Sequence, residues 1–259
     1  MRVRGLSSIV AAVAEMRRAD DELKVAGVAA ARAALAMRPM DVRRMFLVES
    51  RVPDFRDVLA ELAKSRLVYR IVPSDELEKI AGTNHHEGVC VVTAPIEERD
   101  FEDLLAIRGE ALVLAAPGIE NPHNLGAILR VAAHFGVTAL LLEETDPRLS
   151  AATCRTSEGG AEHVPIVRVP RIADALGRAR RAGFTVLGSS SHDGAKDLYD
   201  VKTSDRTIWV VGNEARGLPG QVLAVCDAVV RIPGSGHVES LNLATATAIL
   251  LAEARRPKR

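Results

Sequence analysis

The chain has 259 residues, of which 47% are hydrophobic, so it can form one large domain or two smaller ones with a substantial core. This composition excludes a wholly disordered polypeptide. Lysine and arginine equal aspartate and glutamate at 34 each, so the bulk charge does not by itself identify a nucleic-acid-binding protein. A neutral total remains compatible with a local basic face.

The three cysteines are odd in number and far apart in the sequence. This spacing argues against a disulfide framework and against a zinc site built on Cys-x-x-Cys pairs, and it favours a reducing compartment. No apolar run approaches the roughly 20 residues of a membrane span. The apolar stretch 8–14 is followed at once by Glu15 and Arg17, so an amphipathic helix is a better interpretation than a signal peptide. We therefore expect a cytoplasmic protein without a metal site.

The first half of the chain alternates helix and strand signals. Helices are predicted over 25–37, over 55–65 and from Ser74 onward, and strands over 44–48, 67–72 and 88–93. Ser74 is expected to be an N-cap that precedes an acidic first turn. These elements predict a small α/β domain within residues 1–95, with an N-terminal helical extension and a charged linker over 96–110.

A second series of strands and helices predicts another domain over residues 111–259. Its strands are expected at 111–116, 139–142, 185–188, 208–211 and 228–232, and its helices at 125–135, 172–182, 219–225 and 241–254. The strands are uniformly apolar, as in a parallel sheet that helices cover on both faces. Ligands of such sheets bind at the carboxyl ends of the strands.

The first polar segment at a strand end is 121–130. On a helix that begins at Leu125, Arg130 lies about 200° from Ile128 and points away from the apolar stripe. Asn124 lies at the helix N-terminus, where exposed amides favour anions. Taken alone, the segment is better explained by an N-cap at Asn124 and a surface charge at Arg130 than by a ligand site.

The second polar segment, 209–218, is a strand that runs into a glycine-containing loop. We expect Gly212 to let a ligand approach the backbone, and Glu214 to place a carboxylate at the strand's carboxyl end. Taken alone, this segment is explained by an ordinary strand, turn and helix.

The third polar segment, 232–243, contains Gly234 and Gly236 in a flexible loop. Ser240 and Asn242 lie at the entry of the closing helix. Burial of Asn242 would be costly unless its amide were hydrogen-bonded.

Together and in this order, the three segments resemble the signature motifs of the SpoU (TrmH-type) branch of the SPOUT RNA methyltransferases. The resemblance covers roughly residue 112 to the C-terminus. It rests on Asn124-x-Gly-x-x-x-Arg130, on Gly212-x-Glu-x-x-Gly-Leu218 and on Ile232-Pro followed by Ser240-Leu-Asn242. The first half resembles the ribosomal-protein-like RNA-binding domain of many members, and its stretch 84–92 is similar to the family's His-Gln-Gly-Val-Val, with Glu87 in place of Gln.

The resemblance implies an RNA 2′-O-ribose methyltransferase that uses S-adenosylmethionine and works as a homodimer through its knot region. It implies an α/β fold whose C-terminal parallel-sheet domain contains a deep trefoil knot, a rare exception to unknotted topology. The implied donor-binding positions are Gly212, Ile232 and Leu241, and the implied polar active-site positions are Asn124, Arg130, Glu214, Ser240 and Asn242. In such a fold Ser189 and Ser190 are expected to form another wall of the donor pocket.

The role of Arg130 stays open at this point. The resemblance points to it as the activator of the ribose hydroxyl, yet a guanidinium with a pKa above 12 is a poor base. Arg130 could accept a proton if it were strongly perturbed. It could instead stay charged, hold a phosphate and stabilise the developing alkoxide, which is the role we favour.

Other functions remain to be weighed. A non-catalytic RNA-binding relative is disfavoured because the polar motif positions are intact. A dinucleotide-dependent oxidoreductase is disfavoured because Gly-x-Gly-x-x-Gly does not follow the strand 111–116. The ancillary domain favours ribosomal RNA over transfer RNA as the substrate. Housekeeping and resistance-conferring methylation both remain open.

Overall fold

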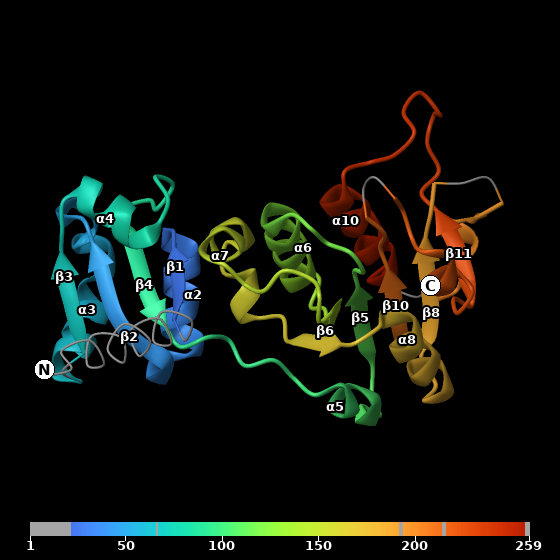
Figure 1. The fold of residues 1–259 in the computed structure, drawn as a ribbon, viewed down its shortest axis with the longest axis horizontal. Helices are drawn as coiled ribbons and strands as arrows, with labels where there is room; N and C mark the ends of the chain where they lie inside the picture. The colour runs from blue at the N-terminus through green and yellow to red at the C-terminus, as the bar shows by residue number, and fades with distance from the viewer. Residues whose placement is uncertain (1–21, 66, 192–193, 214–215, 257–259) are drawn as a thin grey trace, which may run out of the picture. The chain divides into compact units, whose positions relative to one another are not determined.

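The structure is a computed structural model that describes residues 22–65, 67–191, 194–213 and 216–256 (Figure 1). The chain divides into two compact units, the first ending at Ile96 and the second beginning at Glu97. None of the helices in the described part is long and apolar enough to cross a membrane.

The first unit is a four-stranded mixed sheet in the order β1-β4-β2-β3. β2 and β3 are parallel, whereas β4 is antiparallel to both β1 and β2. The strands are β1 (Leu23–Ala26), β2 (Val42–Leu47), β3 (Val68–Ile71) and β4 (Val89–Thr93), and the helices are α2 (Val28–Met37), α3 (Arg56–Lys64) and α4 (Ser74–Ala81).

Helices cover both faces of this sheet. Met45 and Leu47 of β2 pack with Phe55 and Leu59 on the side of α2 and α3, whereas Phe46 packs with Leu77 of α4. Successive side chains of a strand point to opposite faces, so one strand contributes to both cores.

Two details of the first unit correct the sequence predictions. The segment predicted as a helix over 25–37 is the strand β1 followed by α2, and Gly27 between them has φ 101°. Pairing of β1 with β4 buries Val25 and Ala26, and this tertiary contact overrides the helical preference of the alanine-rich run. Ser74 is the first residue of α4 rather than its N-cap, which is Pro73.

The second unit is a seven-stranded sheet in the order β7-β6-β5-β10-β8-β11-β9. Every pairing between its described strands is parallel, as the apolar strand pattern predicted. The strands are β5 (Ala111–Ala115), β6 (Ala139–Glu143), β7 (Ile166–Val169), β8 (Thr185–Ser189), β9 (Lys196–Asp197), β10 (Arg206–Val210) and β11 (Ala228–Arg231).

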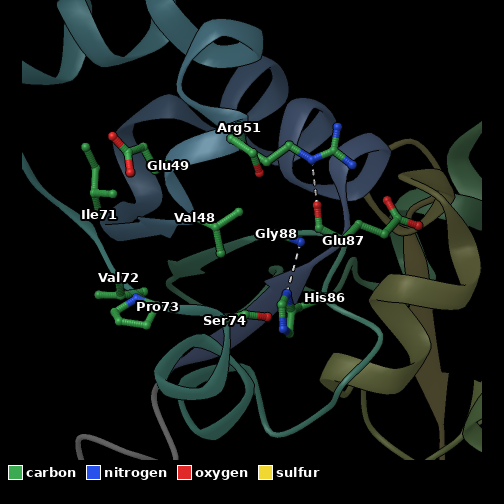
Figure 2. Close-up of a pocket in the computed structure, with 11 residues that line it drawn as sticks. Val48, Glu49, Arg51, Ile71, Val72, Pro73, Ser74, His86, Glu87 and Gly88 are labelled. Carbon is green, nitrogen blue, oxygen red and sulfur yellow. Dashed lines mark hydrogen bonds between the residues drawn. The ribbon is translucent and has the colours of Figure 1, made fainter.

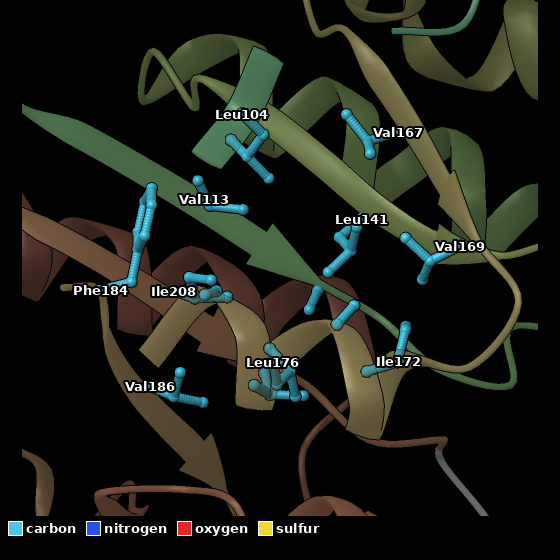
Figure 3. Packing of buried hydrophobic residues seen from close by; sticks show 14 of the residues in the cluster. Leu104, Val113, Leu141, Val167, Val169, Ile172, Leu176, Phe184, Val186 and Ile208 are labelled. Atoms are coloured by element: carbon cyan, nitrogen blue, oxygen red, sulfur yellow. The ribbon is translucent and has the colours of Figure 1, made fainter. Parts of the chain in front are cut away.

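Two groups of helices flank this sheet (Figure 1). In one core, Leu104, Ile172 and Leu176 pack over Val113, Leu141 and Ile208 of the central strands (Figure 3). The helices of that core are α5 (Phe101–Ala106), α8 (Ile172–Arg181) and α9 (Gly220–Leu223). The remaining helices are α6 (Pro122–His134), α7 (Ala151–Ser157) and α10 (Leu243–Ala254), and α6 packs against both α7 and α10.

The segment 96–110, expected to be a linker, contains the helix α5. The Asp100 carboxylate caps α5 by accepting a hydrogen bond from the Glu102 amide at 3.0 Å, and both Phe101 and Leu104 are buried. The buried Arg168 side chain also holds Glu98, with Nε 2.7 Å from the Glu98 carboxylate. These contacts attach the charged segment to the second unit.

Candidate active site

The carboxyl ends of four neighbouring strands define the candidate site. β5, β10, β8 and β11 are adjacent and parallel, so the loops that follow them leave the sheet at the same edge. Two of these loops, after β10 and β11, carry the second and third sequence motifs, and the loop after β5 leads into the first. Ser189 ends β8, and the Ser190 amide donates to the Val230 carbonyl at 2.9 Å. Segments that lie up to about a hundred residues apart in sequence therefore meet here.

Side chains connect the loops after β5 and β10. The Asn213 side-chain amide donates to the Gly118 carbonyl at 2.8 Å. Arg216 also forms an ion pair with Glu120 across the same two loops. At the base, the Val211 amide donates to the Ala115 carbonyl at 2.9 Å. These two loops therefore form one connected unit.

The buried carboxylate of Asp146, beyond β6, holds the loop after β5 from the other side. Its oxygens accept hydrogen bonds from the Gly118 amide at 3.1 Å and from the Glu143 amide at 2.7 Å. Burial raises the pKa of the Asp146 carboxyl above its ordinary value of 3.8, and the two backbone donors and Arg168 oppose that rise. Gly118 is thus held between Asp146 at its amide and Asn213 at its carbonyl.

Gly212 is needed for close packing of its own loop. A Cβ on Gly212 would lie 2.4 Å from the carbonyl carbon of Gly217 and 2.6 Å from the amide nitrogen of Leu218. The Gly217 amide also donates to the Asn213 carbonyl at 2.8 Å, so the loop closes on itself. We expected this glycine to leave room for a ligand, but the space beside it is occupied by the loop's own backbone.

The loop after β11 is exposed along its whole length, from residue 233 to residue 242. Nothing lies within 4 Å of a Cβ built on Gly234, and Leu241 is 43% exposed. Ile232, at the base of the loop, is half-buried. Asn242 is exposed and is the N-cap of α10, since its Oδ1 accepts from the Ala244 amide at 2.9 Å and from the Thr245 amide at 3.3 Å. Asn242 therefore avoids the cost of burial.

The first motif lies on α6, which begins earlier than predicted. Asn121 is the N-cap, with Oδ1 2.8 Å from the amide nitrogen of His123, and Pro122 is the first helical residue. Asn124 is therefore in the first turn, next to the strand ends. Arg130 is six positions farther, roughly 9 Å along the helix axis. Its side chain is 64% exposed, and Nη1 lies 3.7 Å from the Glu158 carboxylate.

Thiol and metal chemistry find no support in the described part of the chain. The cysteines at 90, 154 and 226 are free thiols, and burial raises the pKa of Cys90 and of Cys226 to about 11. Thiols with such a pKa stay protonated near neutral pH and are poor nucleophiles. No group of His, Cys, Asp and Glu in these residues is arranged to hold a metal ion.

Comparison with known families identifies both units. Residues 111–252 match the SpoU rRNA Methylase family, and residues 24–99 match the RNA 2′-O ribose methyltransferase substrate binding family. The chain belongs to the SpoU methylase family. The members of this family are RNA methyltransferases. The fold expected from the sequence is a parallel α/β sheet that follows a small N-terminal domain, and the observed sheet order and division into two units confirm it.

Named relatives of this SpoU protein cover most of its length. The Uncharacterized tRNA/rRNA methyltransferase YfiF of Escherichia coli O157:H7 is 36% identical over 252 residues, covering 97% of this chain and 72% of the relative. The 23S rRNA (guanosine-2′-O-)-methyltransferase RlmB of a Burkholderia species is 37% identical over 203 residues, covering 77% and 81%. The SpoU methyltransferase AviRb from Streptomyces viridochromogenes, solved with AdoMet, has a TM-score of 0.76 at 26% identity, covering 92% of this chain and 91% of AviRb.

The expected site residues of this SpoU protein fall into three groups. The first group lies at or next to the strand ends that form one edge of the sheet, and it contains Gly212, Ser189, Ser190, Ile232 and Asn124. Ser240, Leu241 and Asn242 lie on the exposed loop after β11, and Arg130 is on the exposed side of α6. Glu214 lies outside the described residues.

Sequence reasoning missed the residues that build the loops of this SpoU site. Each of these residues acts through a partner that lies far away in sequence; they are Asp146, Asn213, and the pair Arg216 and Glu120. Gly126 of the first motif is explained by packing, because a Cβ there would lie 2.7 Å from the Thr153 carbonyl oxygen on α7. A buried aspartate or a glycine at a helix contact has no local sequence signal. Only Asn121, which precedes a proline, could have been recognised as an N-cap.

Proposed function

We propose that the protein transfers a methyl group from S-adenosylmethionine to a ribose 2′-hydroxyl of RNA. The observation that carries the proposal is the convergence of the three motif segments at one edge of the parallel sheet. The match of residues 24–99 to a 2′-O-ribose methyltransferase substrate-binding family supports the ribose hydroxyl as the acceptor. RNA modified in this way resists alkaline cleavage at the methylated nucleotide, because the 2′-oxygen can no longer attack the adjacent phosphate.

The residues at the strand ends suit S-adenosylmethionine, whose role is to supply an electrophilic methyl group. Hydroxyls of Ser189 and Ser190 can bind the polar groups of the donor, and Ile232 and Leu241 can contact its apolar surfaces. The open space around Gly234 leaves backbone amides of the third loop accessible. Gly212 would act differently, by allowing the loop 212–218 to fold compactly beside the pocket.

Arg130 is proposed to act with its charge rather than as a base. A guanidinium is effectively always protonated in a protein, and Arg130 forms an ion pair with the Glu158 carboxylate at 3.7 Å. The exposed side chain can reach RNA that lies over α6, bind a phosphate and stabilise negative charge on the 2′-oxygen. The ribose is proposed to be positioned by Asn124, Ser240, Asn242 and Glu214. The proton of its 2′-hydroxyl would leave to water.

The trefoil knot and the homodimer are also proposed. After β11 the chain returns as α10 and packs against α6, which follows β5, so its path must pass the loop after β10 that lies between. Such a return supports threading of the C-terminal segment. The exposed Arg130 and the exposed apolar Leu241 support a second subunit that completes the site. Sedimentation of the purified protein over a range of concentrations tests the dimer.

Ribosomal RNA is the favoured substrate, because RlmB is named for methylation of 23S rRNA, and a cytoplasmic location follows from such a substrate. Relatives are named for both tRNA and rRNA, so the test must compare the two. Total RNA from cells with and without the gene is mapped for alkali-resistant nucleotides. A site lost only from rRNA supports the proposal, a site lost only from tRNA reassigns the substrate, and methylation of bases alone refutes the ribose acceptor.

A further inference from the structure

The first unit contains an open hollow of about 790 Å³ at one edge of its sheet (Figure 2). Cavities of roughly 300–1,000 Å³ are typical of small-ligand sites. The hollow is formed where β2 and β3 end and β4 begins, so three chain segments meet there. Its lining residues are Val48, Glu49, Ser50, Arg51, Ile71, Val72, Pro73, Ser74, His86, Glu87 and Gly88.

His86 presents a fixed hydrogen-bond donor to the hollow. Only 6% of this residue is exposed, and its Nδ1 accepts a hydrogen bond from the Gly88 amide at 2.9 Å (Figure 2). Nδ1 is therefore the unprotonated nitrogen, and the neutral ring carries its proton on Nε2. Within the described residues Nε2–H has no hydrogen-bond partner. Because Nε2 is not among the buried unpartnered atoms of the described residues, it is accessible, and a ligand that accepts from Nε2–H would replace its hydrogen bond to water.

The conformation that holds His86 is built by its neighbours. Glu87 and Gly88 have φ of 52° and 82°, and the Arg51 side chain donates from Nε to the Glu87 carbonyl at 2.8 Å. A Cβ on Gly88 would lie 2.8 Å from side-chain atoms of both Arg51 and Val48. A left-handed conformation at a residue other than glycine costs free energy, and here contacts from Val48 and Arg51, in the segment that follows β2, maintain it.

The charges of the hollow do not suit a phosphate. Arg51, the only cation among the described residues that line it, forms an ion pair with Asp54 at 2.9 Å. Arg70 nearby is paired with Glu76 at 3.2 Å. The Glu49 carboxylate lines the hollow, and no described residue forms an ion pair with it. A ligand that offers N–H donors to Glu49 and an acceptor to His86 is therefore favoured over an anion.

We propose that this hollow binds an unpaired guanine base of the RNA substrate, an inference that rests on the proposed function. The Watson–Crick edge of guanine carries two neighbouring N–H donors that a carboxylate can accept together, and O6 and N7 can accept from Nε2–H. Val48, Ile71 and Pro73 provide apolar surface for the ring. RNA is read in this way when its bases are unstacked and splayed out.

Glu87 provides a matched control because its side chain acts elsewhere. Its Oε2 accepts a hydrogen bond from the Val28 amide at 2.9 Å and so satisfies the first turn of α2. Glu87→Gln keeps an acceptor at that position, removes one negative charge and leaves Glu49 and His86 untouched.

The test measures binding of two labelled oligouridylates to the full-length protein by fluorescence anisotropy. One strand carries a single central guanine, and the other carries adenine in its place. We expect the wild type to prefer the guanine strand by about tenfold, the scale of one good base contact. His86→Asn retains an acceptor for the Gly88 amide but lacks the Nε2–H donor, and Glu49→Gln lacks the carboxylate. Both variants should lose the preference, whereas Glu87→Gln should keep it.

Methyl transfer to RNA from cells that lack the gene is measured in parallel for each variant. Loss of guanine preference with an unchanged rate at saturating RNA supports the inference. Equal binding of the two strands by the wild type, or preference that survives both hollow variants, overturns it while leaving the proposed function intact. Absence of any ribose methylation by the wild type instead overturns the proposed function. Thermal unfolding of each variant shows whether a loss of binding is a loss of folding.

Discussion

Substitution of Gly212 by alanine tests whether the loop after β10 is as closely packed as the structure indicates. The added Cβ would lie 2.4–2.7 Å from three backbone atoms of Gly217 and Leu218. Carbon atoms in contact prefer about 3.5–4.0 Å, so the loop would have to open by about 1 Å. Overpacking of this kind costs about 1–3 kcal/mol, and the lower chain entropy of alanine offsets about 0.4–1 kcal/mol of it. We expect a net loss of about 1–2 kcal/mol in the free energy of unfolding.

Gly234→Ala is the matched control for that substitution. Nothing lies within 4 Å of the methyl group that it would add, and neither Gly212 nor Gly234 has positive φ. Urea unfolding measures stability, and calorimetry with S-adenosylmethionine measures donor affinity. Gly234→Ala should leave stability unchanged or slightly raised. If Gly212→Ala were as stable as the wild type and bound the donor equally well, close packing of the loop would not be the reason for this glycine.

Three further variants test the rest of the site. Arg130→Ala should lower the single-turnover methylation rate by about a hundredfold or more while donor affinity is retained. Arg130→Lys should recover part of the rate, whereas a fully active alanine variant would remove Arg130 from the mechanism. Asn242→Ala should lower the free energy of unfolding by about 1 kcal/mol through loss of the α10 N-cap, whereas Asn242→Asp should retain the cap. Equal melting temperatures for the wild type and Asn242→Ala would contradict a stabilising N-cap. The raised pKa means that the folded state binds the proton of the Asp146 carboxyl more tightly than the unfolded state does. The contribution of Asp146 to the free energy of unfolding should therefore fall as the pH rises from 3.8 through the folded pKa. The difference in unfolding free energy between wild type and Asp146→Asn, measured across that range, should show this slope, and a flat difference refutes it.

The parallel sheet of the second unit was predictable because its strands are buried on both faces. Uniformly apolar runs such as β5 and β6 have no other common explanation in an α/β chain. The elements that were missed are short or atypical. β1 is four residues long and joins an alanine-rich helix, and α5 lies in a charged segment in which Phe101 and Leu104 supply the burial. Their structures depend on tertiary partners, which local patterns do not contain.

For the candidate site, the sequence indicated which segments would meet but not how they are held. Each motif follows a strand of the same parallel sheet, and the carboxyl ends of such strands share an edge, so the convergence of the motif segments could be predicted. The structural reason for a glycine at position 212 could not be predicted. The atoms that a Cβ would meet belong to Gly217 and Leu218, and no single residue determines the path of their loop. The hollow beside His86 also has no sequence signal, since it forms where β2, β3 and β4 meet at one edge of the sheet.

The two sides of the proposed donor pocket differ in how they are supported. On one side, Asp146, Gly118 and Asn213 form a continuous series of hydrogen bonds that fixes the loops after β5 and β10. On the other side, the loop 233–242 exposes Val238 by 71% and Leu241 by 43%. Exposed apolar side chains on an otherwise polar loop indicate a surface that something covers. Because the Arg130 side chain is exposed as well, we infer that a second subunit covers the part of this loop that the donor does not contact. A monomer would then bind the donor weakly, and donor affinity should rise with protein concentration through the range in which the dimer forms.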